Sequence, residues 1–413
     1  MTSSVRPSPP EGNERGAVAL LRPTPRFLWL MGVFILSAAT VGAREVTRVG
    51  YVTDSLGSEF GIGIVAVVFA LSLALSSVVA GRHMDVADPR PFLIGSLLTA
   101  GVLTATNAWF LARGPMPVGW LVISTALDAI IFGAATTALL KVQAAIVRSD
   151  ARGAAETVNI LRSGIGAAVG TVAAGLIGDQ VTTLVISGAI SVLLGVVTAA
   201  IVAPVTVPTS QKVQRRLVDL VQIVRTRPPL RRTVTVDLVL AAALPTQFIA
   251  LVIVDLDAPE LTTVAFTSSL MGLLLGRLAL TITGVRGNLT RRLRITYLGF
   301  TTLALVAIPS LIGGWILNYP VLVAAIVFVG SALISFTQNL PAALLQQQVP
   351  DEFRGSLSGA MNAARNLLIG AAAAVLAALT YAHNAAVLTV AMVALLVTGY
   401  VVAGRFREVT ASV

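Results

Sequence analysis

The stretch GRHMDVADPRPFL, residues 81–93, is a polar interruption between two long apolar segments. It is rich in charged side chains, whereas segments 61–80 and 92–111 on either side of it contain none. Each flanking segment has about 20 residues, the length an α-helix needs to cross a hydrocarbon core of ~30 Å. A short polar loop between two such segments predicts a pair of neighbouring transmembrane helices.

The same alternation continues through the whole chain of 413 residues, of which 56% are hydrophobic and 12% charged, with a mean hydropathy of +0.87. Soluble domains carry about 25% charged residues. We therefore expect an all-α membrane protein with twelve transmembrane helices. The predicted spans are 27–46, 61–80, 92–111, 119–140, 158–178, 182–203, 233–254, 263–284, 295–316, 320–342, 357–380 and 385–404.

A long polar segment divides the spans six and six. It contains QKVQRRLVDLVQIVRTRPPLRR, which predicts an amphipathic helix along the membrane surface; a solvated linker is the alternative. The apolar face of that helix would carry Leu217, Leu220, Val221 and Val224. The expected domains are a disordered tail over 1–25, a six-helix bundle over 26–203, a linker over 204–232, a second bundle over 233–405 and a tail over 406–413.

The net charge of +10 reflects the orientation of the chain in a membrane rather than binding to nucleic acid. All but three of the 29 Lys and Arg residues lie at the termini or in alternate loops, and the exceptions are Arg44, Arg48 and Arg113. This bias predicts that both termini are cytoplasmic, in a cell (inner) membrane. The chain has no cysteine and only two histidines, so we expect no metal site and no cofactor.

The two halves resemble each other in sequence. RGAAETVNILRSGIG begins at Arg152 and RGSLSGAMNAARNLLIG begins at Arg354, each after the fourth span of its half. Both contain an Asn-x-x-Arg pair. The repeated polar residues are Asn159 with Arg162 and Asn362 with Arg365. Parallel repeats of six spans are a known architecture of secondary transporters.

Several motifs resemble those of the major facilitator superfamily, in its twelve-span type, over essentially the whole chain. In the opening stretch, Gly81, Asp85, Arg90 and Leu93 match the pattern of the family's loop between spans two and three, although Asp88 and Pro89 depart from it; VPDEFRG, 349–355, resembles a second family loop. The resemblance implies a fold of two six-helix bundles. It also implies a cytoplasmic gate that pairs charges across the halves.

We assign six polar residues and one glycine to this gate. The alternative is that they are topology charges, or bond loop carbonyls. The assigned residues are Gly81, Asp85, Arg90, Asn159, Arg162, Asn362 and Arg365.

The carboxylate of Asp128 lies in the apolar stretch STALDAIIFG, residues 124–133. It is about 12–15 Å deep from the nearer end of its span. A charge there costs about 2.5–3.5 kcal/mol on insertion scales, so we expect it to face a cavity or a partner. A role in proton coupling is the sharper hypothesis and a structural acid is the alternative. Arg44 and Glu45, near the outer end of span one, are either a gate or second proton site, or an interfacial charge pair.

Span five contains GIGAAVGTVAAGLIG, in which Gly166, Gly170 and Gly175 predict close helix packing. The segment also resembles an antiporter motif of the family, with Thr171 and Ala174 as departures. The span-four arginine of the family's drug/proton antiporters is absent, because Ala129 stands at its position before Gly133. Mid-span amides are expected to bond substrate or a neighbouring helix; they are Gln247, Gln338 and Asn339.

The sequence therefore predicts a secondary active transporter, not an enzyme. The expected partners are the bilayer, protons and a small molecule. We expect no cluster of buried arginines, and this favours proton-coupled export of an amphipathic or cationic lipophilic substrate. The alternatives are an uptake permease for a small neutral metabolite and a membrane scaffold that no longer transports.

Overall fold

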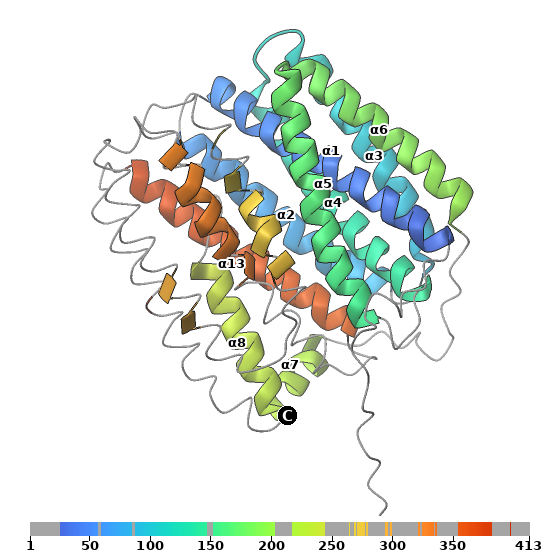
Figure 1. Cartoon of the computed structure of the whole chain (residues 1–413), viewed down its shortest axis with the longest axis vertical. Helices are drawn as coiled ribbons and strands as arrows, with labels where there is room; N and C mark the ends of the chain where they lie inside the picture. The colour runs from blue at the N-terminus through green and yellow to red at the C-terminus, as the bar shows by residue number, and fades with distance from the viewer. Residues whose placement is uncertain are drawn as a thin grey trace, which may run out of the picture.

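The computed structural model describes residues 25–56, 59–84, 87–146, 152–202, 217–243 and 354–381, with short pieces between 264 and 336 and residue 397. Within these residues the chain is helical and contains no strand. Figure 1 shows the helices as a bundle. They are α1 (Pro25–Leu56), α2 (Glu59–Met84), α3 (Pro89–Leu111), α4 (Val118–Ile146), α5 (Arg152–Ile177), α6 (Gln180–Ile201), α7 (Leu217–Thr226), α8 (Pro228–Ala243) and α13 (Arg354–Tyr381).

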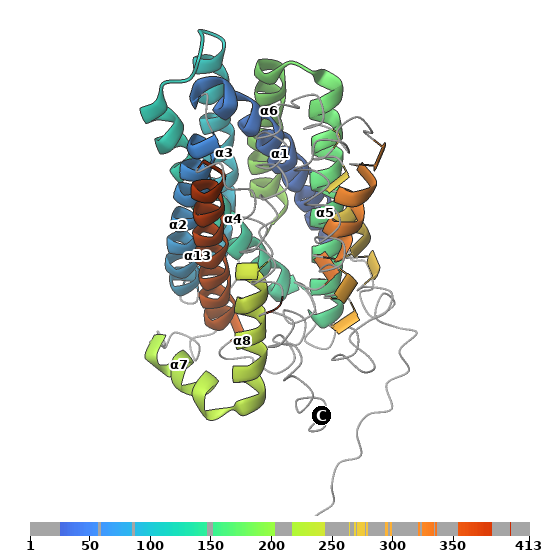
Figure 2. The ribbon, with the colours of Figure 1, turned by 90° about the vertical axis from the view of Figure 1, so that its left-hand side faces the viewer.

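Helices α1 to α6 coincide with the first six predicted spans and pack against one another as an N-terminal half. The closest neighbours are α3 with α6, α1 with α5, and α2 with α4. Across the halves, α13 lies along α2, and Figure 2 shows the two side by side. An added Cβ at Gly370 would overlap that of Ala70, and one at Gly359 would lie 3.2 Å from the Ser77 carbonyl.

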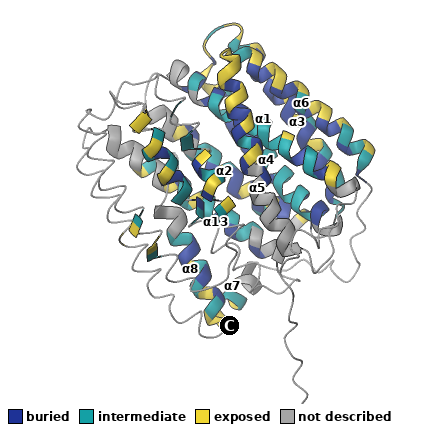
Figure 3. Ribbon diagram, viewed as in Figure 1, coloured by how far each residue is buried: buried dark blue, intermediate teal, exposed yellow. Residues whose placement is uncertain are grey.

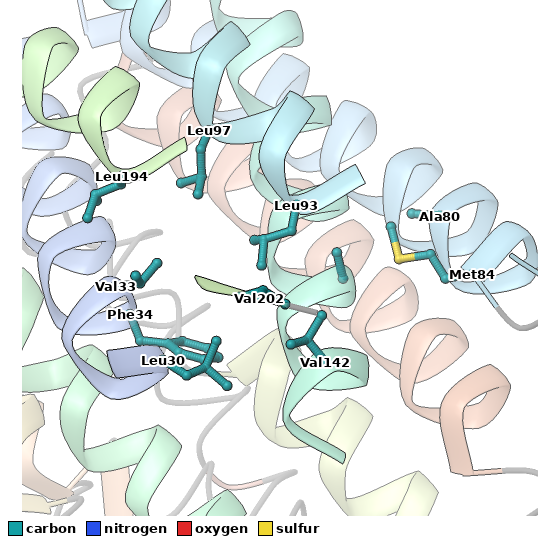
Figure 4. Packing of buried hydrophobic residues seen from close by; sticks show 11 residues of the cluster. Leu30, Val33, Phe34, Ala80, Met84, Leu93, Leu97, Val142, Leu194 and Val202 are labelled. Atoms are coloured by element: carbon teal, nitrogen blue, oxygen red, sulfur yellow. The ribbon is translucent and has the colours of Figure 1, made fainter. Parts of the chain in front are cut away.

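Two clusters of buried apolar side chains fill the N-terminal half. One lies near the α2–α3 connection and gathers side chains from α1, α2, α3, α4 and α6 (Figure 4). Its largest members include Phe34, Met84 and Leu93. The other lies near the α3–α4 connection and includes Tyr51 and Leu121. Arg44, Glu45 and Arg48, described below, lie on α1 between the residues that it contributes to these two clusters.

Apolar residues are also exposed on the outer faces of the helices. Figure 3 shows exposed positions, in yellow, along α6. The exposed fractions of Val102 and Leu193 are 63% and 60%, values more typical of surface polar residues in a soluble protein. Such faces suit lipid contact. Among the described residues, four helices are long and apolar enough to cross a membrane: Leu28–Val52, Pro89–Leu111, Val118–Gln143 and Gln180–Ile201.

The first span differs most from the prediction. The sequence places its end at residue 46, near Arg44 and Glu45, but α1 continues to Leu56. The reason is that the charges in this part of α1 are paired inside the protein and do not mark a helix end. Of the later spans, 295–316 and 385–404 lie mostly outside the described residues, and 263–284 and 320–342 are described only in pieces.

A helix, α7, lies inside the predicted linker and packs on the second half. Its Ile223 and Val224 contact a cluster formed by Leu230 of α8 with Leu357 and Met361 of α13. The prediction placed Val221 and Val224 on one apolar face along the membrane surface. In the structure Val224 packs on α8 and α13, whereas Val221 is 53% exposed.

Candidate functional site

A network of four charged side chains joins α1 to α4 in the N-terminal half. Nη1 of Arg44 donates a hydrogen bond to Oδ1 of Asp128 at 3.0 Å. Nη2 of Arg48 donates to Oδ2 of the same carboxylate. Both carboxylate oxygens of Asp128 are therefore held by guanidinium groups, and all three side chains are at most 9% exposed.

Arg48 is shared between two carboxylates. Its Nη1 lies 3.1 Å from Oε1 of Glu45, three residues earlier on α1, while its Nη2 binds Asp128. The ring of Phe69 from α2 lies 5.2 Å from the guanidinium carbon of Arg48. Glu45 is the most accessible member, with 38% of its side chain exposed. It is thus the carboxylate of the network that the protein encloses least.

A threonine of α3 completes the contacts of Arg44. Oγ1 of Thr104 donates to the Ala100 carbonyl at 2.7 Å and accepts from Nη1 of Arg44 at 3.2 Å. With two arginines and two carboxylates, the four charges sum to zero. Mutual pairing is what makes burial of such groups tolerable in a low-dielectric interior.

Three buried polar atoms beside the network have no hydrogen-bond partner within the described residues. They are Nε of Arg44, Nε of Arg48 and Oγ1 of Thr125, which lies one turn before Asp128 on α4. A buried donor without a partner is unfavourable by about 1–3 kcal/mol. The site therefore has hydrogen-bonding capacity beyond what the four charged groups use.

The sequence places Arg44 near the outer end of span one, as part of a gate or second proton site or as an interfacial charge, and it counts Arg48 among the outer-side charges. Both are buried inside α1. One expectation from the sequence is wrong here: it predicts no buried arginine cluster, yet these two arginines form one. From the sequence, a charged residue at a helix end looks the same as a charged residue in a buried ion pair. The partner of both arginines, Asp128, is 84 residues from Arg44 and 80 residues from Arg48. The Arg-x-x-x-Arg spacing, one helical turn, was the available signal.

Glycines of α5 hold α1 close enough to carry this network. A Cβ at Gly166 or at Gly170 would overlap backbone oxygens of α1, those of Ile35 and Ala39. From the other side, a Cβ at Gly42 would overlap the Ala167 carbonyl. The backbones of α1 and α5 are thus in direct contact. Gly175, predicted to belong to the same face, is instead exposed, because five residues on an α-helix turn the side chain to another side.

Arg162, one of the two repeat-related arginines, is buried among side chains of its own half. Its Nη1 lies 3.2 Å from Sδ of Met31, and its Nη2 lies 3.4 Å from Oε1 of Gln143. Its guanidinium carbon is 2.9 Å from the centroid of the Phe34 ring. These contacts tie α5 to α1 and α4, so in this conformation Arg162 braces its own half.

Arg365, the second repeat-related arginine, binds Asp237. Its Nε donates to Oδ2 at 2.6 Å and its Nη2 donates to Oδ1, so the pair is bidentate between α13 and α8. Asp237 is only 2% exposed, because the guanidinium of Arg365 reaches into the α8–α13 contact.

The opening stretch of sequence makes contacts inside the N-terminal half. Nη2 of Arg90 donates to the Ala199 carbonyl of α6 at 2.5 Å, so within the described residues Arg90 does not link the two halves. Asp88 caps α3 by accepting from the Arg90 backbone, ahead of Pro89. This accounts for both departures from the family pattern, since an N-cap acid followed by proline starts a helix well. A Cβ at Gly81 would meet nothing within 4 Å.

The remaining predicted residues are not placed. Asp85, Gln247, Gln338 and Asn339 lie outside the described residues. Asn159 is in α5, but its side chain is not among those described, and Asn362 is half-buried in α13. Among the described residues, α2 packs on α13 across the two halves.

Comparison with known proteins gives a consistent result. The model of the Major Facilitator Superfamily matches residues 31–374. The human organic anion transporter MFSD10 (TETRAN) is similar in structure, with a TM-score of 0.68 and 12% identity over 92% of this chain and 100% of that chain. The nucleoside transporter NupG has a TM-score of 0.63 and 14% identity over 94% and 99%. A variant of the E. coli fucose:proton symporter FucP has 0.64 and 14% over 92% and 97%. No curated protein matches by sequence. At these identities the likeness shows the fold.

Proposed function

Because this chain belongs to the major facilitator superfamily, we propose that it is a proton-coupled exporter of an amphipathic small molecule that works by alternating access. Membership makes it an integral, multi-pass membrane transporter with the fold of that family, and not an enzyme. Its substrate, its direction of transport and its coupling ion are what this proposal adds.

The observation that carries the proposal is the division of Arg48 between two carboxylates. Arginine remains protonated in proteins, so Asp128, held by two guanidinium groups, remains ionised while both contacts last. Glu45 is held by Arg48 alone and is far more exposed. We assign Glu45 as the group that takes up and releases the proton, and Asp128 as the fixed counter-ion.

Protonation of Glu45 would change the balance of the network. The four charges then sum to +1, and Nη1 of Arg48 loses its ionised partner. Because Glu45 is partly exposed, the extra positive charge costs only about 0–1 kcal/mol, which can shift the balance between two arrangements without unfolding the protein. The protein can relieve this charge by rearranging α1 against α4 or by binding an anion. Either response links a proton to a conformational step, which is what coupling requires.

The charge of the substrate decides the direction of coupling. A lipophilic cation would compete with the proton for Glu45, and competition for one carboxylate produces exchange, which suits export. This cationic class was favoured by the expected absence of buried arginines, and that argument no longer holds.

A substrate carboxylate is the second candidate, favoured by the unpartnered donors of Arg44, Arg48 and Thr125. It would bind Arg48 in place of protonated Glu45. Proton and anion would then travel together, which suits uptake. A structural neighbour is described as an organic anion transporter and another as a proton symporter.

Flux in proteoliposomes tests the assignment of Glu45. The purified protein would be reconstituted, given a pH gradient, and tested with tetraphenylphosphonium as a lipophilic cation and cholate as an amphipathic carboxylate. We expect gradient-driven movement of one probe by the wild type, and equilibration without accumulation by Glu45→Gln. Continued accumulation by Glu45→Gln would remove the proton role from Glu45. Movement of neither probe by the wild type would favour the scaffold alternative.

We also propose that both termini are cytoplasmic, on the basis of the Lys and Arg distribution. The natural absence of cysteine makes this directly measurable. Ser4→Cys and Ala112→Cys, the latter in the α3–α4 turn, would be labelled in intact cells with a membrane-impermeant maleimide. We expect labelling at position 112 only. Labelling at position 4 alone would reverse the topology.

A further inference from the structure

The elbow between α7 and α8 combines exposed arginines with an exposed apolar side chain. Arg225 and Arg227 lie at the end of α7, Pro228 begins α8, and Arg231 follows one turn later. All three arginines are exposed. Within 204–232 the sequence has one acidic residue, Asp219, and seven basic ones: Lys212, Arg215, Arg216, Arg225, Arg227, Arg231 and Arg232.

The elbow is held in a fixed place on the second half of the protein. Ile223 and Val224 pack on Leu230, Leu357 and Met361, at the start of both α8 and α13. The backbone is continuous through the bend, since the Arg227 amide donates to the Ile223 carbonyl and the Arg231 amide to the Arg227 carbonyl. The exposed side chains are therefore held in place by packing where α8 and α13 begin.

The side of α7 that faces away from this cluster has the character of a lipid contact. Val221 is 53% exposed and lies one helical turn before Arg225, so an apolar group and a cation share one face. An apolar side chain can enter the acyl boundary while a guanidinium reaches the phosphate layer beside it. A soluble polyanion would match the cations but leave Val221 exposed.

We propose that the α7–α8 elbow is a binding site for the headgroups of anionic phospholipids, with Arg225, Arg227 and Arg231 as its phosphate ligands. Guanidinium groups bind phosphate oxygens in a bidentate manner. Basic side chains at a membrane surface add about fivefold each to the affinity for anionic lipid, so three together account for roughly 100-fold. This site is separate from the Glu45 network, and it holds whether or not the transport proposal does.

Lipid titration of the full-length protein in a neutral detergent tests the site. Phosphatidylglycerol or phosphatidylcholine would be added, and binding followed by native mass spectrometry together with the rise in melting temperature. We expect the wild type to bind phosphatidylglycerol much more tightly than phosphatidylcholine. We expect R225Q/R227Q/R231Q to lose this preference by roughly 100-fold, and R225K/R227K/R231K to keep most of it, since the charges remain.

Arg113 supplies the matched control. It is an exposed arginine at the opposite end of the molecule, where its guanidinium carbon lies 3.6 Å from the Trp109 ring centroid. R113Q should leave the lipid preference unchanged. An equal loss in R113Q, or an unchanged preference in the triple Gln variant, would overturn the proposal. So would displacement of phosphatidylglycerol by millimolar inorganic phosphate, because it would indicate a general anion site. If the triple variant does not fold, the single Gln variants replace it, each expected to lose about fivefold.

Discussion

Asp128 and Asp237 are both buried carboxylates that join two helices of one half, but they are held differently. Asp237 is gripped by Arg365 alone, through two hydrogen bonds between α8 and α13. Asp128 is gripped by Arg44 and Arg48, one at each oxygen, and Arg48 also reaches Glu45. Asp237 and Arg365 therefore form a closed pair, whereas Asp128 belongs to an open network in which Glu45 is accessible.

The difference indicates what each site can do. A bidentate pair uses both oxygens of its acid on one partner, so it has no second arrangement of similar energy close by. In the network, Arg48 can redistribute between two carboxylates without leaving the protein interior. A group with two available partners can act as a conformational switch, whereas a closed pair serves as a structural ion pair. Substitutions at the two sites, and at the helix contact that supports the network, test this distinction.

The largest effect is expected for Asp128→Asn. Two buried guanidinium groups would lose their shared counter-ion, and breaking a buried pair in this way costs about 3–5 kcal/mol. We expect a large fall in the apparent melting temperature of the purified protein in detergent. Asp128→Glu, which keeps the charge, should recover part of it. An Asn variant as stable as the wild type would show that the arginines do not depend on Asp128.

Asp237→Asn should be destabilising by about 3 kcal/mol, at the lower end of the same range, because Arg365 is 24% exposed and water can rescue it in part. The closed pair should be replaceable: Asp237→Leu combined with Arg365→Met is expected to regain most of the stability and to keep transport. A stable double variant that no longer transports would give this pair a functional role and end the distinction.

Gly170→Ala should disturb the network without touching a charge. The new Cβ would overlap the Ala39 carbonyl and push α1 away from α5, at a cost of about 1–3 kcal/mol. Gly175→Ala is the matched control, since Gly175 is exposed on the same helix and the change should be neutral or slightly stabilising. Equal melting temperatures of the two variants would contradict the contact between α1 and α5.

The smallest effect on stability is expected for Glu45→Gln, about 0–1 kcal/mol, since the exposed side of an ion pair contributes little. Its effect on transport should be large although its effect on stability is small. We expect flux that responds to a substrate gradient but no longer to a pH gradient. If Glu45→Gln instead unfolds the protein, the role of Glu45 is structural and it does not act as a switch.

Several features were predictable from local sequence. The starts of α3 and α6 lie within three residues of the predicted spans, and each begins after an aspartate that caps it, Asp88 and Asp179. The helix cap is visible in sequence because the capping side chain bonds a backbone amide only two or three residues away. The glycines at 166 and 170 were likewise predicted as a packing face, although the α1 partner was not.

The repeat shows where this kind of reasoning stops. Asn-x-x-Arg recurs in the two halves, and the prediction gave Arg162 and Arg365 one role at one gate. In the structure Arg365 binds a carboxylate, while Arg162 lies among a thioether, an amide and an aromatic ring. The two halves share the motif, but the residues that contact the arginine from neighbouring helices differ between them.

That this chain is a helical membrane protein follows from its residues alone, because the penalty for polar groups in hydrocarbon acts on each span of about 20 residues independently. The need of Asp128 for a partner follows in the same way. Which partner it finds depends on how the helices pack, because Arg44 and Arg48 are 84 and 80 residues away and approach through the contact between α1 and α4. The close backbone contact of α1 with α5 sets that approach, and no local pattern encodes it.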